Sequence, residues 1–273
     1  MRAKSVTLSE IFLWYKDLTM ETHLAVLDYL APSNLLENRI ILVTGAGDGI
    51  GRAAAKAFAA HGAEVILLGR TPQKLVVVYD EIENAGGKKP AIYPMNLEGA
   101  SLQDYHTLSE TLAKEFGVIH GILHNAAWLG SHTPLTHYDL RQWYKVLQIN
   151  LNAPFFMTQA LLPLLKKADH ASVLFTIDDA GLQGQAYKGA YGVSKFGLQG
   201  LMQTFAEENE VNTSVRFNSI NPGPVLTQMR RLGYPAEDAS RLLRPEDIMA
   251  PYLYLMGNDS LGINGQTFSC QKA

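Results

Sequence analysis

The sequence predicts an α/β fold, with one domain built on a doubly wound parallel sheet. From Arg39 onward, short apolar runs alternate with helical patterns of roughly 10 to 20 residues. No internal repeat, low-complexity tract or linker divides the 273 residues. Right-handed crossovers between such strands put helices on both faces of the sheet. We therefore expect an N-terminal extension at 1–38 and a single α/β domain at 39–273.

The composition of the chain argues against a nucleic-acid-binding, membrane-spanning or disulfide-rich protein. The chain is 47% hydrophobic and 18% charged with a net charge of −3, so it lacks the basic excess typical of a nucleic-acid-binding groove. No uncharged apolar run approaches the ~18 residues that span a membrane. One cysteine, Cys270, excludes an internal disulfide and suits a reducing compartment, and the eight histidines form no metal-ligand pattern. We expect a cytoplasmic protein that binds neither nucleic acid nor membrane nor metal.

The extension does not share the alternating pattern. Leu8–Leu18 fits one amphipathic helix with Ser9 as its N-cap. The short run Ile11–Tyr15 is too brief for the core of a signal peptide. Met20 is an alternative start residue, in which case the first 19 residues would be a start-site artefact. Both interpretations stay open.

The first half of the domain is delimited by its caps and glycines. Gly62 ends the first helix, which is rich in alanine. Thr71 is placed to cap the second helix, with Pro72 at the first helical position and Gly86 at the end. The predicted elements are strands at 39–45, 64–69, 91–95 and 118–125 and helices at 49–62, 71–87 and 101–117.

The second half continues the alternation. A capping box formed by Thr136 and Asp139 predicts the start of a long helix whose apolar face runs to about Leu165. The remaining predicted elements are strands at 171–177 and 213–220, an edge strand at 265–269, and helices at 186–209 and 244–257.

A glycine-rich turn, TGAGDGIG, joins the first strand to the first helix. Gly45 suits a tight turn, Gly49 lets the backbone approach a pyrophosphate, and Gly51 lets helix pack against strand. The amides of the helix N-terminus then face the phosphates. The alternative is a tight turn without a ligand. The turn predicts a Rossmann-type dinucleotide site whose first contacts are Gly45, Asp48, Gly49, Ile50 and Gly51.

The residue after the second strand selects the dinucleotide. An acid there would bind the adenosine ribose hydroxyls of NAD. This chain has Gly69 and then Arg70, and a guanidinium matches a 2′-phosphate. We expect NADP(H) to be favoured over NAD(H), the alternative being that Arg70 is a solvated surface charge.

Tyr191 and Lys195 lie four residues apart in a predicted helix, so they share one face. An ammonium near a phenol stabilises the phenolate and lowers its pKa, as an oxidised nicotinamide also would. The pair makes a proton donor for reducing a carbonyl to an alcohol. The spacing alone is common, but its place downstream of a dinucleotide turn makes chance a poor explanation.

These features resemble the short-chain dehydrogenase/reductase family. The matching pieces are TGAGDGIG, HNAA after the fourth strand, Asn150 in QINLNAPF, YGVSK, and NPGPVLT after the sixth strand. The resemblance covers roughly Asn38 to Phe268. Within the family, the sequence as a whole resembles the YciK-type bacterial oxidoreductases. Those proteins are assigned as oxidoreductases largely by family membership, so the resemblance does not identify a substrate.

The resemblance implies roles for individual residues. Tyr191 would be the catalytic acid, Lys195 would hold the nicotinamide ribose, and Asn150 would complete a water-linked proton relay. Further cofactor contacts would be Asn96, Leu97, Asn125, Ala126, Pro222, Gly223, Val225 and Thr227. The segment at about 228–244 would cover a small carbonyl or alcohol substrate, and its four arginines would meet an acidic substrate, meet the cofactor phosphate, or form a solvated face. The family also implies a homodimer or homotetramer.

Pro154 gives a physical reason for a relay at Asn150. Proline has no amide hydrogen, and its ring crowds the carbonyl four residues earlier, which is that of Asn150. That carbonyl would be free to bind a water. The alternative is a simple kink in the helix.

Asp178 departs from the family pattern. Thirteen residues before Tyr191, the family places a serine that donates a hydrogen bond to the substrate carbonyl. An ionised carboxylate cannot donate, and it opposes negative charge on that oxygen. It would also favour the neutral phenol or pair with Lys195.

Three interpretations of Asp178 stay open. It is protonated and donates like the serine, or it binds a basic substrate, or catalysis has been lost. The sequence therefore predicts an NADP(H)-dependent oxidoreductase with Tyr191 as general acid, and the alternative is a catalytically impaired NADP(H)-binding protein.

Overall fold

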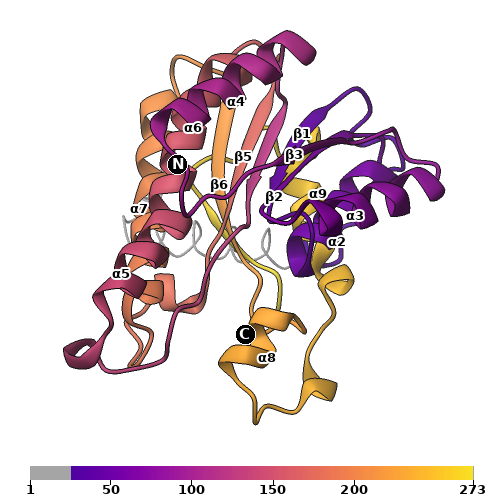
Figure 1. The fold of residues 1–273 in the computed structure, drawn as a ribbon. Helices are drawn as coiled ribbons and strands as arrows, with labels where there is room; N and C mark the ends of the chain where they lie inside the picture. Colours follow the sequence, from indigo (N-terminus) through magenta and orange to yellow (C-terminus); the bar gives the residue numbers. More distant parts are fainter. Residues whose placement is uncertain (1–25, 273) are drawn as a thin grey trace, which may run out of the picture.

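A seven-stranded, wholly parallel sheet with helices on both faces forms the molecule in the computed structural model, which describes residues 26–272 (Figure 1). The strand order is β3-β2-β1-β4-β5-β6-β7. The strands are β1 (Ile40–Thr44), β2 (Glu64–Gly69), β3 (Ala91–Pro94), β4 (Gly121–His124), β5 (Ala171–Thr176), β6 (Val215–Asn221) and β7 (Thr267–Ser269). The predicted Rossmann-type single domain is confirmed, and β7 lies at the edge as expected.

The sheet separates two hydrophobic layers. The helices are α2 (Gly49–Ala60), α3 (Pro72–Asn84), α4 (Leu102–Glu115), α5 (Leu140–Leu147), α6 (Ala153–Leu165), α7 (Gly189–Asn209), α8 (Gln228–Gly233) and α9 (Met249–Met256). One layer contains α2, α3 and α9, and the other contains α4, α6 and α7.

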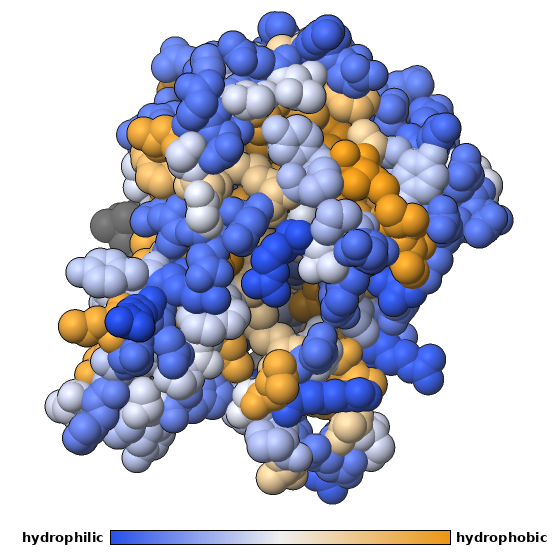
Figure 2. All heavy atoms as spheres, in the orientation of Figure 1, coloured by the Kyte–Doolittle hydropathy of each residue, from blue (hydrophilic) through white to orange (hydrophobic). Residues whose placement is uncertain are grey.

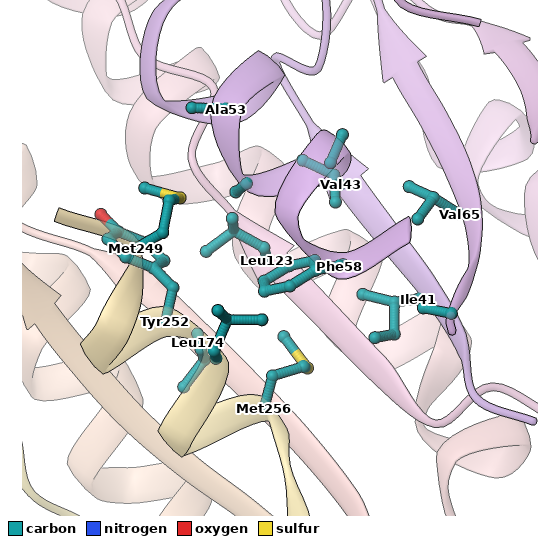
Figure 3. Close-up of a cluster of buried hydrophobic side chains, with 14 of the residues drawn as sticks. Ile41, Val43, Ala53, Phe58, Val65, Leu123, Leu174, Met249, Tyr252 and Met256 are labelled. Atoms are coloured by element: carbon teal, nitrogen blue, oxygen red, sulfur yellow. The ribbon is translucent and has the colours of Figure 1, made fainter. Parts of the chain in front are cut away.

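Strand β1 shows how the layers are filled. Ile41 and Val43 face the α2 side and Leu42 faces the α6 side, since successive side chains of a strand point to opposite faces. In Figure 3, Phe58 of α2 lies among strand residues and the side chains of α9. Because both faces are buried, the strands are continuous apolar runs, which is why they could be predicted.

The helix start predicted from Thr136 and Asp139 is wrong in part. Leu135–His137 forms a separate 3₁₀ turn, and the Thr136 hydroxyl contacts the adjacent His137 ring. Asp139 alone caps α5, by accepting a hydrogen bond from the Gln142 amide at 2.9 Å. The helix therefore starts three residues later than predicted.

The long helix is also interrupted. A π-helical turn, Gln148–Asn152, joins α5 to α6, and the amide of Ala153 donates to the carbonyl of Gln148. Pro154 explains the turn, because it offers no amide to the carbonyl of Asn150 and its ring crowds that oxygen. The sequence left open a simple kink or a freed carbonyl at this proline, and the structure has a π-helical turn there.

Two further helices begin later than predicted. Helix α7 begins at Gly189 (φ 48°) and not at 186, because Tyr187 (φ 66°) has a left-handed backbone conformation that a right-handed helix cannot contain. The helix expected at 244–257 opens with a 3₁₀ turn, Pro245–Ile248, before α9.

Part of the extension packs against the domain. Val26 and Leu36 are buried in the α2 layer, and the Tyr29 hydroxyl donates to Asp259 at 2.7 Å. The helix predicted at Leu8–Leu18 lies outside the described residues. Within 26–272, none of the helices has the length and apolar character needed to cross a membrane. The face seen in Figure 2 is mainly hydrophilic, with small separate hydrophobic patches.

Candidate active site

The carboxyl ends of β1 and β4 diverge at the point where the strand order reverses, and the glycine-rich turn lies there. Gly45 has φ 69°, which a residue with a Cβ rarely adopts. A Cβ at Gly51 would collide with the carbonyl oxygen of Gly45 and lie 2.7 Å from the Asn125 amide nitrogen. The turn is thus as tight as the sequence predicted, and α2 starts directly behind it.

Thr44 fastens the loop after β4 to this turn. Its hydroxyl donates to the Leu123 carbonyl at 3.2 Å and accepts the amides of Asn125 and Ala126, each at 3.0 Å. Two residues predicted to touch the cofactor are therefore held beside the glycine turn by one buried hydroxyl.

Asp48 has a structural role that the sequence did not reveal. Its carboxylate accepts from the Gly49 amide at 2.8 Å, as the N-cap of α2, and meets Lys74 of α3 at 2.5 Å. The hydrogen bond from Lys74 is the main reason that the pKa of Asp48 is lowered. A cofactor contact at Asp48 would therefore come from its backbone.

Arg70 follows β2 and is exposed. No hydrogen bond or ion pair engages it within residues 26–272. A free guanidinium at the end of β2 fits the phosphate contact predicted for it. In the segment that follows the neighbouring strand β3, Asn96 is exposed and Leu97 is buried.

Tyr191 lies in the first turn of α7 and is buried. Its hydroxyl donates to Asp178 Oδ2 at 3.2 Å, while Asp178 Oδ1 accepts from the Ala180 amide at 2.9 Å. Burial, then the Asp178 charge and hydrogen bond, raise the pKa of Tyr191 well above its ordinary value. In the free protein the phenol is firmly protonated.

Lys195 lies one turn further along α7, with its ammonium 5.6 Å from the centre of the Tyr191 ring. It donates to the carbonyl of Thr176 at 2.6 Å. The sequence left open whether Asp178 interacts with the Tyr191 phenol or with Lys195, and in the structure it accepts a hydrogen bond from the phenol. Burial lowers the pKa of Lys195 to about 8, against the opposing effect of Asp178.

Asn150 ties three segments together. Its side-chain oxygen accepts from the Trp128 amide at 2.8 Å, and its nitrogen donates to the Trp128 carbonyl at 3.0 Å and to Ser194 at 3.1 Å. Ser194 in turn donates to the Tyr191 carbonyl at 2.7 Å. The side chain is thus committed to the scaffold, and the backbone carbonyl at the π-helical turn is the group available for a relay.

The loop after β6 carries Pro222, Gly223, Val225 and Thr227. Thr227 caps α8 by accepting from the Arg230 amide at 3.1 Å, and its methyl group lies near Gly49. Gln271, which the sequence analysis missed, donates to the carbonyls of Pro222 and Pro224, each at 2.8 Å. A residue near the end of the chain therefore holds the loop expected to contact the nicotinamide.

A second group of residues contains Lys188 and Tyr234, which were not predicted, and Arg230, whose ion pair was not predicted. Lys188 precedes Tyr191 by three residues, is buried, and contacts Tyr234 of the segment after α8. Arg230 stacks on Tyr234 at 3.8 Å and forms a two-pronged ion pair with Glu237, at 2.7 and 2.6 Å. Of the four arginines noted in this segment, one is therefore a built part of the cover over the phenol.

Depressions of 340 and 690 Å³ lie beside the segment after β3. The first is lined by Asn96, a predicted cofactor contact, and its neighbours, and the second lies between the residues after β3 and α5. Neither touches Tyr191 or the glycine turn, where hydrogen-bonded and titratable groups form the candidate site.

The residues present fit a nicotinamide dinucleotide. The tight turn leaves no room for a Cβ, the amides of α2 begin behind it, an unpaired guanidinium follows β2, and the phenol–ammonium pair lies past β5. All of these lie at the carboxyl edge of one sheet. A family model for short chain dehydrogenases matches residues 39–237.

Proteins similar to this chain are oxidoreductases and short chain dehydrogenases. The chain is 44% identical over 243 residues to the uncharacterized oxidoreductase YciK of Escherichia coli K12, covering 89% of this chain and 96% of that protein. It is 52% identical to a short chain dehydrogenase structure from Pseudomonas syringae, with a TM-score of 0.88 and coverage of 89% and 99%. It is 44% identical to a short chain dehydrogenase from Shigella flexneri 2a complexed with NADP, with a TM-score of 0.86 and coverage of 88% and 100%.

Proposed function

Since the chain belongs to the short chain dehydrogenase family of oxidoreductases, we propose that it uses NADP(H) to interconvert a small carbonyl compound and its alcohol. One observation carries the proposal: the buried phenol of Tyr191 has the Lys195 ammonium 5.6 Å from its ring, at the edge where the dinucleotide would bind. The lone buried thiol, Cys270, suits a reducing cytoplasmic setting.

The bound nicotinamide supplies the hydride for this chemistry. Tyr191 Oη gives its proton to the substrate oxygen as that oxygen gains negative charge. Lys195 stabilises the phenolate left behind and is placed to hold the nicotinamide ribose. The Asn150 carbonyl binds the water through which the phenol regains a proton.

The Asp178 carboxylate favours one direction of reaction. It keeps the phenol in the protonated form that carbonyl reduction requires, whereas alcohol oxidation requires the phenolate. The same raised pKa makes the phenol a weaker acid than the neighbouring Lys195 alone would make it. The substrate carbonyl must then replace Asp178 as the acceptor of the Tyr191 proton. We therefore propose reduction as the working direction.

Cofactor choice follows from Arg70. Its guanidinium is unpaired within the described residues and matches a 2′-phosphate, and a structure that is 44% identical contains NADP. We propose contacts to the dinucleotide from the glycine turn, Asn96, Leu97, Asn125, Ala126, Lys195, Pro222, Gly223, Val225 and Thr227.

A second candidate is an NADP(H)-binding protein without turnover. The hydrogen bond from Tyr191 to Asp178 favours this candidate, because the phenolic proton that a substrate needs is already donated to Asp178. The carboxylate also places negative charge where the substrate carbonyl oxygen would become negative during reduction. Asp178 is the residue that separates the two candidates.

The test is NADPH oxidation with a panel of diketones, quinones and aldehydes. We expect wild-type turnover and a loss of about 100-fold or more in kcat for Tyr191→Phe. Tyr187→Phe is the matched control, because this exposed tyrosine lies outside the proton path. NADH should have a KM at least about tenfold above that of NADPH, since it lacks the charged phosphate.

Asp178→Ser decides between the candidates. Wild-type turnover that the serine variant does not exceed supports the oxidoreductase with a working Asp178. A silent wild type with an active Asp178→Ser variant establishes the second candidate. If calorimetry detects no NADPH binding, both are wrong.

A further inference from the structure

Lys188 is a buried ammonium next to the catalytic phenol. Its side chain is 7% exposed and lies 5.7 Å from the centre of the Tyr191 ring. It donates to the hydroxyl of Tyr234 and lies 4.9 Å from the centre of that ring. No carboxylate pairs with it within residues 26–272. Buried charges in proteins are normally paired, so this ammonium lacks its expected partner.

The carboxylates that engage the neighbours of Lys188 are already committed. Asp178 accepts from the phenol and from a backbone amide, and Glu237 accepts both prongs of Arg230. His132 packs edge-on against Tyr234, and burial, with the nearby Lys188 charge, lowers its pKa. None of these groups neutralises the ammonium.

The backbone around Lys188 is strained. Tyr187, a bulky residue, has φ 66°, and Gly189 has φ 48° at a place where a Cβ would collide with the Tyr138 ring. Such conformations persist at functional sites, where the surroundings hold them. Here they turn Lys188 inward at the start of α7 while Tyr187 stays exposed.

The surroundings of the phenol are otherwise aromatic. Tyr138 packs with Tyr191 in one cluster, and Trp128, Leu129 and Trp143 pack against it. The cofactor phosphates are expected at the glycine turn and Arg70, on the β1–β2 side, so they do not explain the charge at Lys188. An ammonium that has no carboxylate partner among residues 26–272 and lies between two aromatic rings fits an anionic group on an apolar substrate.

We propose that Lys188 binds a carboxylate of the substrate, so that the preferred substrates are oxo acids or carboxylated aldehydes. This rests on the proposed reductase function. Tyr191 then meets the carbonyl while Lys188 meets the carboxylate a few bonds away, and Tyr234 positions the ammonium from the cover.

Matched acids and esters test the proposal. The pairs are 4-carboxybenzaldehyde with methyl 4-formylbenzoate, and acetoacetate with methyl acetoacetate, each reduced with NADPH. Lys188→Met should raise KM for the acids by roughly 10- to 100-fold and leave the esters unchanged, because a hydrogen bond to a charged group is lost. Lys188→Arg should retain the preference for acids. Arg231→Met, which removes an exposed cation of α8, is the control.

Two other results overturn the proposal. Wild-type protein that reduces the esters as well as the acids has no anion site, although the reductase function then stands. Equal loss of kcat for acid and ester in Lys188→Met, with a shifted pH profile, means that the ammonium acts only through Tyr191.

Calorimetry on the NADP⁺-loaded protein gives a readout that does not depend on turnover. Acetoacetate and 4-carboxybenzaldehyde should bind to wild type and bind at least about tenfold more weakly to Lys188→Met. If neither acid binds to the loaded wild type, the anion site is wrong. If they bind through Lys188 but no carbonyl is reduced, the reductase function is wrong and the anion site stands.

Discussion

At Tyr191, two ammonium groups lie near the ring: Lys188 immediately precedes the helix that carries the phenol, and Lys195 lies on it. Lys188 and Lys195 lie 5.7 and 5.6 Å from the ring centre, one turn before and one turn after it. Among residues 26–272, Asp178 alone accepts a hydrogen bond from the phenol. Opposing charges therefore surround one titrating group, and each has a separate pH-dependent effect.

For Lys195 the effect reaches the stability of the fold. The folded chain releases this proton near pH 8 and the unfolded chain near 10.5, so between these values unfolding takes up a proton and rising pH favours the folded state. Relative to Lys195→Met, wild-type unfolding free energy should increase by about 2 kcal/mol from pH 7 to 9.5. Urea unfolding of both proteins without cofactor measures it. Parallel pH profiles would contradict the assignment.

Whether a residue of the site could be predicted depends on how far along the chain its partners lie. Tyr191, Lys195 and Asp178 could be placed from the sequence because one helix and the end of one strand fix their spacing. The burial of Lys188 depends on Tyr234, 46 residues away, and the loop at Pro222 depends on Gln271, 49 residues away. Periodicity carries no information about such contacts.

Among the elements, the π-helical turn at Gln148–Asn152 is the one with a direct link to chemistry. Pro154 withholds the amide that would engage the Asn150 carbonyl, and the turn widens there. The same chain contains a second proline in this helix, Pro163, far from the turn. The two prolines make a matched pair for a test.

Pro154→Ala should close the turn into regular α-helix and engage the Asn150 carbonyl. We expect kcat to fall by about tenfold or more while stability is kept or raised, because proton delivery is impaired and a helix hydrogen bond is gained. Pro163→Ala should leave kcat unchanged. Steady-state kinetics and thermal unfolding check both variants. An unchanged kcat in Pro154→Ala rules out the relay and leaves a simple structural role.

Element boundaries show where sequence patterns fail. Thr136 and Asp139 fit a capping box by spacing, yet a helix start is decided by one side chain meeting one amide, and here that is Asp139 with Gln142. Ser101 and Asp104 have the same spacing and do form a capping box at the start of α4. Spacing alone therefore does not distinguish a true capping box from a false one. The strands were predicted more closely because burial on both faces fixes their composition.

For the whole molecule, topology was the easiest feature to predict. Short right-handed crossovers leave few ways to order seven parallel strands, and the observed order reverses once, between β1 and β4. The placement of α8 over the start of α7 does not follow from such rules. In Figure 1 this segment extends from the carboxyl edge of the sheet, where the cofactor and substrate would bind.

Exposed apolar side chains form a face through which copies of the chain would pair. Leu140 and Tyr144 of α5 and Val193 and Phe196 of α7 are exposed, and the two helices lie side by side (Figure 1). We expect a homodimer or homotetramer that uses this face. Light scattering should give two or four times the 30.0 kDa of one chain.

Charge on that face should dissociate the assembly. A Leu140→Asp/Phe196→Asp protein should elute as a monomer, since buried carboxylates oppose association. Leu232→Asp is the control, because this exposed leucine lies on α8. A wild-type monomer, or an unchanged mass in the double variant, contradicts the expectation.

The left-handed backbone at Tyr187 has a consequence for engineering. A programme that seeks thermostability would replace this tyrosine with glycine, which adopts φ 66° without steric penalty. The exchange would also give the chain freedom to rotate Lys188 away from the phenol. If Lys188 binds the substrate carboxylate as proposed, a heat-resistant variant selected in this way would gain melting temperature and lose substrate discrimination, so selection at this position has to follow selectivity as well as stability.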